Sequence, residues 1–98
     1  MITLIQFKNE RKNQEIELTI GLKNCALDYE TASKIRAFIE AVRNNKNDNK
    51  DKGDWIEWAN KKADWYDPSI AYEDELLGVR DHGKDEEYKK LEKSYRYW

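Results

Sequence analysis

Cysteine and histidine are almost missing from this 98-residue chain, which contains one of each. A single cysteine, Cys25, excludes an intramolecular disulfide and is typical of short proteins from a reducing compartment. We interpret it as a small buried hydrophobe. The only histidine, His82, is far from Cys25 in the sequence, and neither residue belongs to a recognisable catalytic motif. The sequence therefore does not indicate nucleophilic catalysis, and we expect a protein that is not an enzyme.

Glycine-rich loops and long apolar runs are also missing. The four glycines are isolated from one another, so none of them forms a phosphate-binding loop. The apolar start of the chain, residues 1–7, lacks a basic region before its apolar residues and is too short for a signal peptide or a membrane span. We therefore expect a cytoplasmic protein with no cofactor, no metal and no contact with a membrane.

Charged and aromatic residues, by contrast, are abundant. Charged residues account for 39% of the chain and its mean hydropathy is −1.09, but four Trp, six Tyr and two Phe supply enough apolar surface for a folded core. The length fits a single small domain over residues 1–98. The charge is uneven, because residues 54–87 carry a net charge of −7 and residues 88–98 a net charge of +3. Such asymmetry marks a solvated face or a partner surface.

The first part of the chain, residues 1–43, is predicted to form an antiparallel β-hairpin packed on an amphipathic helix. Ile16, Leu18, Ile20 and Leu22 alternate with polar residues at the period of a strand with one buried face. Asp28 is predicted to cap the helix, over about residues 28–43, whose apolar residues share one stripe. These are Ala32, Ile35, Phe38, Ile39 and Val42. The predicted fold class is therefore α+β.

The second part is predicted to be helical and to follow a polar linker over residues 44–53. Asp54 is expected to cap a helix that ends near Tyr66, with an aromatic face that something must cover. A short helix over about residues 68–77 is expected between Pro68 and Gly78, because proline favours the start of a helix and glycine its end. A last helix is expected from Asp85, so residues 54–98 form an acidic, aromatic half with two or three helices.

The proposed site lies in this half, where several large rings stand among carboxylates over about twenty residues. We expect that a chain of this size leaves some of these rings unburied, and exposed aromatic residues flanked by acids suit a basic protein partner. We therefore predict a protein-binding module, of the kind that phages and mobile elements encode as inhibitors or adaptors. The predicted partner-binding residues are Trp55, Trp58, Trp65, Tyr66, Tyr72, Glu73, Asp74 and Glu75.

Three alternatives remain open. The acidic cluster around Asp64, Asp67 and His82 contains ligand types that a divalent metal needs, which would suit a metal-dependent enzyme, although their spacing matches no known metal motif. The aromatic face could instead be covered in a homodimer, as in a self-associating structural protein. The basic aromatic tail from Tyr88 could stack on nucleic acid, but a pI of about 5.5 argues against nucleic acid as the main partner.

Overall fold

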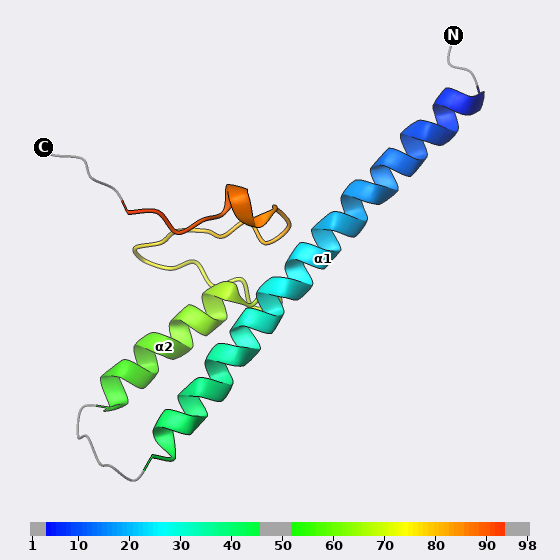
Figure 1. The fold of residues 1–98 in the computed structure, drawn as a ribbon. Helices are drawn as coiled ribbons and strands as arrows, with labels where there is room; N and C mark the ends of the chain where they lie inside the picture. The colour runs from blue at the N-terminus through cyan, green and yellow to red at the C-terminus, as the bar shows by residue number, and fades with distance from the viewer. Residues whose placement is uncertain (1–3, 46–51, 94–98) are drawn as a thin grey trace, which may run out of the picture.

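A computed structural model of the chain describes residues 4–45 and 52–93 and is built from two helices. Helix α1 spans Leu4–Arg43 and helix α2 spans Lys52–Tyr66, and a single 3-10 turn, η1, spans Glu86–Tyr88. Figure 1 shows α2 running back along the second half of α1, with the irregular segment 67–93 lying across one end of α2 and the middle of α1. Within the described ranges there is no strand, only an isolated bridge between Asp74 and Gly78.

The predicted β-hairpin, and with it the α+β fold class, is wrong. Residues 4–27 continue into the expected helix, so α1 is one element of 40 residues. Residues two apart on a helix lie on nearly opposite sides, so Ile16 and Ile20 occupy one side while Leu18 and Leu22 occupy the other. The expected turn, residues 8–14, contains strong helix formers and no glycine or proline. Nothing in that segment therefore ends the helix.

The two helices meet through small side chains. On α1 the buried positions Asn24, Asp28, Ala32 and Ile39 recur at helical spacing, and α1 packs against α2, whose buried positions include Ala59 and Ala63. The ring of Phe38 meets that of Trp55 edge to face, with centroids 5.8 Å apart. The apolar core of the molecule consists of the buried side chains of Ala32, Ile39, Ala59, Ala63 and Trp65.

Two of the predicted helices differ from the structure. Residues 68–77 form turns, because the Asp67 carboxylate accepts hydrogen bonds from the Ser69 backbone and hydroxyl, and Ala71 has a φ of 52°, which a helix cannot contain. The last helix is limited to η1, because Lys89 turns back into contacts with the body of the protein. The helix expected from Asp54 is confirmed, although it begins at Lys52.

The remaining predictions lie partly outside the described residues. Residues 46–51 of the predicted linker and residues 94–98 of the predicted last helix are not among those that the structure describes. Asp28 is wrongly predicted as a helix cap, since it stands in the middle of α1. The helix it was expected to start does cover residues 28–43, as the second half of α1.

The first half of α1 projects away from the rest of the molecule. Every described residue from Leu4 to Ile20 is exposed, and Figure 1 shows this part of the helix extending beyond the other elements. We call residues 4–22 the arm. Neither α1 nor α2 contains a stretch sufficiently long and apolar to cross a lipid bilayer.

Candidate binding surface

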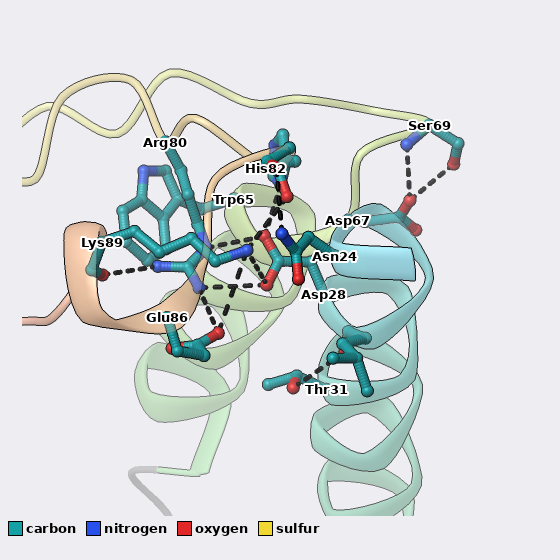
Figure 2. A network of polar contacts seen from close by, with 12 residues as sticks. Asn24, Asp28, Thr31, Trp65, Asp67, Ser69, Arg80, His82, Glu86 and Lys89 are labelled. Atoms are coloured by element: carbon teal, nitrogen blue, oxygen red, sulfur yellow. Dashed lines mark hydrogen bonds and ion pairs between the residues drawn. The ribbon is translucent and has the colours of Figure 1, made fainter. Parts of the chain in front are cut away.

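A buried carboxylate on α1 organises the segment that follows α2. The Asp28 side chain is 1% exposed, and the Arg80 guanidinium binds it through two hydrogen bonds, Nε to Oδ2 at 2.8 Å and an Nη to Oδ1 at 3.0 Å. His82 Nδ1 lies 2.8 Å from Oδ2, and Lys89 Nζ donates to Oδ1 at 3.2 Å. Figure 2 shows these side chains converging on Asp28 from one loop. Asp28 therefore fixes residues 80–89 against α1.

The loop supports this arrangement with further contacts of its own. Lys89 Nζ also donates to the His82 carbonyl at 2.9 Å, and Arg80 donates to the Lys89 carbonyl at 3.1 Å. One turn before Asp28, the Asn24 amide donates to the Gly83 carbonyl at 3.0 Å and to Asp85 at 2.9 Å. The Asn24 contacts join residues 59 and 61 positions apart in the sequence, so polar contacts from two successive turns of α1 hold the loop.

The surroundings of Asp28 and Arg80 favour the charged forms of both side chains. Burial acts to raise the pKa of Asp28, but the hydrogen bonds from Arg80, His82 and Lys89 outweigh it and the net pKa is lowered. Burial acts to lower the pKa of Arg80, but the hydrogen bonds to Asp28 reverse this and raise it. The guanidinium also lies 5.2 Å from the Trp65 ring centroid and 4.7 Å from that of Tyr66. The cation is thus enclosed by a carboxylate and two rings.

The residues suggested for a metal-dependent enzyme are instead paired with other side chains. Arg36 bridges Asp64, at 3.1 Å, and the buried Asp67, at 2.7 Å. Burial acts to raise the pKa of Asp67, whereas Ser69 and Arg36 lower it, and the net direction is down. His82 contacts Asp28 and not this pair. Among the residues that the structure describes, no group of three or more potential ligands lies close enough to hold a metal ion.

A third buried aspartate shapes a tight turn over residues 74–78. Asp74 accepts hydrogen bonds from the backbone N–H groups of Leu76 and Leu77, both at 2.9 Å, and pairs with Lys62 of α2. The hydrogen bond from Lys62 and those from the backbone lower the pKa of Asp74 to about 2. Two backbone hydrogen bonds join Asp74 and Gly78, and the Trp65 indole donates to the Gly78 carbonyl at 2.8 Å. The turn is therefore fixed to α2 from both ends.

This turn displays an apolar side chain to solvent beside an exposed tryptophan. Leu76, at its tip, is 93% exposed, and Trp58 on α2 is 55% exposed. Both line a pocket of about 250 Å³ that carries four carboxylates and two ammonium groups, one of which, on Lys62, is paired with Asp74. We call this the acidic pocket. Its lining residues are Asp54, Glu57, Trp58, Lys61, Lys62, Tyr72, Asp74, Glu75 and Leu76.

The predicted partner-binding residues divide into two groups. Trp58, Tyr72, Asp74 and Glu75 meet at the acidic pocket, and Glu73 is exposed next to them in the chain. The other three serve the core or its edge.

Trp65 is buried and its ring meets that of Tyr66 edge to face, with centroids 5.1 Å apart. Trp55 packs on Phe38. Of these three rings, that of Trp55 joins α2 to α1, whereas Trp65 and Tyr66 are neighbours on α2, and none of the three lines the acidic pocket.

The sequence prediction missed several residues that matter for this surface. Leu76 was expected inside a short helix, yet it stands at the tip of the turn. Lys62 and Arg80 were not singled out, although they neutralise Asp74 and Asp28. The sequence carries a local signal only for the turn, because an aspartate, Asp74, is followed four residues later by a glycine. Glycine readily adopts a positive φ, and Gly78 has a φ of 77°. The partners of Asp28 follow it by 52 to 61 residues and leave no local pattern.

A second pocket has the opposite charge. It has a volume of about 280 Å³ and combines apolar side chains, among them Val79 and Leu91, with four cationic side chains and one carboxylate, Asp81. Two of its cations, Arg80 and Lys89, are already bound to Asp28. Its other two cations, Lys84 and Lys90, stand against the carboxylate of Asp81, so little net charge is left in this pocket for a ligand.

Comparisons with known proteins leave the function to be argued from this geometry. No protein-family model matches the chain, and no curated protein or solved structure resembles it significantly.

Proposed function

We propose that this protein is a non-catalytic binding module that docks a basic segment of another protein into the acidic pocket. The observation that carries the proposal is the exposure of Leu76 on a turn that Asp74 fixes in place, next to the exposed ring of Trp58. Because the backbone of this turn is already fixed, Leu76 loses little backbone entropy when a partner covers it. That is the property expected of an interface anchor.

The charges around the anchor support a basic partner. Because Lys62 is paired with Asp74, the remaining charges of the pocket are Asp54, Glu57 and Glu75 against Lys61. A segment with Lys or Arg residues and one large apolar side chain would place the apolar group against Trp58 and Leu76, and its cations beside the carboxylates. Aromatic anchors within a charged rim are the usual composition of an interface hot spot. A role as a small inhibitor or adaptor in the cytoplasm follows from this proposal and from the lone cysteine.

Selection from a displayed library of short random peptides tests the proposal. We expect the enriched peptides to combine Lys or Arg with an aromatic or aliphatic residue, and to bind the purified protein in calorimetry. Trp58→Ala is expected to weaken the binding by about 10- to 100-fold. Tyr29→Ala is the matched control, since Tyr29 is about as exposed on α1 and lies outside the pocket lining, and it should change the affinity less than about twofold.

A second pair of variants tests the charge. Glu75→Lys should weaken binding and reduce its dependence on salt, because one carboxylate of the pocket becomes an ammonium group. Glu87→Lys makes the same change on an exposed residue outside the pocket lining and should leave the affinity nearly unchanged. Selection of acidic peptides, or equal effects of Glu75→Lys and Glu87→Lys, would contradict the proposal.

A further inference from the structure

The arm carries an apolar stripe that nothing in the described chain covers. Leu4, Phe7, Leu18 and Leu22 are each at least half exposed, with Leu18 at 70% and Leu22 at 71%. At 100° per residue they lie within roughly an 80° arc of the helix, together with Arg11 and Glu15. The stripe therefore has apolar residues at both ends and two opposite charges in its middle.

The order of these six residues is nearly symmetric about the middle of the arm. If a second arm is laid against the first in the opposite direction, centred near Asn13, Leu4 faces Leu22 and Phe7 lies next to Leu18. In the same register Arg11 faces Glu15, and the two-fold axis repeats each contact. Both copies thus contribute the same residues to a closed, self-complementary interface.

Charge selects this direction over the alternative. In a parallel arrangement in register, Arg11 would face Arg11 and Glu15 would face Glu15, which places like charges together at the centre of the seam. In the antiparallel arrangement each Arg11 meets a Glu15.

We infer that the arm is a self-association element, which pairs with the arm of a second copy as an antiparallel helix dimer along the stripe from Leu4 to Leu22. The seam is about 28 Å long at 1.5 Å per residue and its apolar contacts are few, so the buried area lies near the lower limit of specific interfaces, about 1,000 Å². The dimer is therefore weak and reversible. This inference does not depend on the acidic pocket, because the residues of the arm and those of the pocket do not overlap.

Charge-reversed variants of the full chain test the inference by sedimentation velocity over concentrations up to about 1 mM. The unmodified chain should show a reversible monomer–dimer equilibrium. Arg11→Glu puts two pairs of carboxylates in the seam, Glu15→Arg puts two pairs of cations there, and each variant alone should dimerise at least about tenfold more weakly. A mixture of the two should form a heterodimer, since every central pair is then of opposite sign.

Matched variants distinguish this interface from nonspecific association. Lys12→Glu makes the same charge change as Arg11→Glu but lies about 100° away around the helix, and Ile16→Lys alters the opposite side where Leu18→Lys alters the stripe. Lys12→Glu and Ile16→Lys should dimerise about as well as the unmodified chain, whereas Leu18→Lys should not. A chain that stays monomeric throughout, a dimer indifferent to Arg11→Glu and Leu18→Lys, or a mixture that fails to associate would overturn the inference. A monomer would leave the stripe to a partner of different sequence.

Discussion

Asp28 and Arg80 are 52 residues apart in the sequence and form a buried ion pair in which the two side chains are 1% and 3% exposed. The pair joins the middle of α1 to the loop that follows α2, and the Arg80 guanidinium lies near the rings of Trp65 and Tyr66. Asp67 with Arg36, and Asp74 with Lys62, repeat the arrangement elsewhere. Three buried aspartates, each neutralised by a cation, therefore hold a segment that has almost no regular secondary structure.

Removing the charge of Asp28 should strongly destabilise the protein. Asp28→Asn keeps the size of the side chain but leaves the buried charges of Arg80 and Lys89 with only the exposed Glu86 carboxylate beside them, and breaking a buried ion pair in this way typically costs about 3–5 kcal/mol. Urea unfolding followed by tryptophan fluorescence measures the loss. Glu30→Gln, which removes an exposed carboxylate paired with Lys34 on the same helix, should cost less than about 0.5 kcal/mol. Similar losses in the two variants would show that Asp28 is not an organising residue.

Stability should fall on acidification below about pH 4. The pKa values of Asp28, Asp67 and Asp74 are lowered in the folded protein from 3.8, and that of Asp74 reaches about 2. Because the unfolded chain binds protons first, the stabilisation is complete above the unfolded pKa and is lost as the pH falls through the folded values. Melting temperatures measured from about pH 5 to about pH 2 should show this decline. Asp74→Asn should make the decline shallower, and an unchanged slope would contradict the role of Asp74.

Alanine should lower the stability of the protein at Gly78 and raise it at Gly53. Gly78 has a φ of 77°, and an added Cβ would meet no atom within 4 Å, so the cost of Gly78→Ala is conformational, about 1–2 kcal/mol. Gly53 lies in α2, also with open space around it, and Gly53→Ala should stabilise the helix by up to about 1 kcal/mol. Thermal melting of both variants checks the pair. Stabilisation by Gly78→Ala would rule out the turn as described.

Changing Leu76 should separate binding from stability. Because Leu76 is 93% exposed, Leu76→Ser is expected to alter the free energy of unfolding by less than about 0.5 kcal/mol. If Leu76 is the anchor of the acidic pocket, the same variant should lose most of its affinity for a peptide selected on the protein. Leu77→Ser is a useful neighbour for comparison, since Leu77 lies outside the lining of the acidic pocket. Retained affinity in Leu76→Ser would remove the anchor.

The helix over Lys52–Tyr66 could be predicted because its pattern is local. Ala59, Ala63 and the rings of Trp55 and Trp65 recur at helical spacing and do pack against α1 or the turn that follows. The alternation from Ile16 to Leu22 misled, because exposed apolar residues on two sides of a helix give the same period of two as a strand. The spacing of apolar residues predicts the type of secondary structure only where those residues are buried on one face. The apolar residues of the arm are exposed, so their spacing did not distinguish a helix from a strand.

The site was predictable only in part, and for a related reason. Trp58, Tyr72 and Glu75 were expected in one surface, and they do line one pocket. The pocket itself depends on Asp74 binding two backbone N–H groups and Lys62, an arrangement of turn and helix that no residue pattern announces. Asp28 was expected to cap a helix because it precedes the apolar stripe of residues 32–42, and its actual partners follow 52 to 61 residues later, where no local pattern points to them. Long-range polar contacts therefore account for most of what the sequence did not reveal.

Titration of isotope-labelled protein with a selected basic peptide, followed by amide and indole NMR spectra, tests most directly whether Trp58 and Leu76 form the docking surface. The expected result is that shifts concentrate on residues 54–62 and 72–76, with the Trp58 indole N–H among the largest, while the buried Trp65 indole changes little. Shifts confined to the second pocket, around Lys84 and Lys90, or to the arm, with the Trp58 indole unchanged, would contradict docking at Trp58 and Leu76.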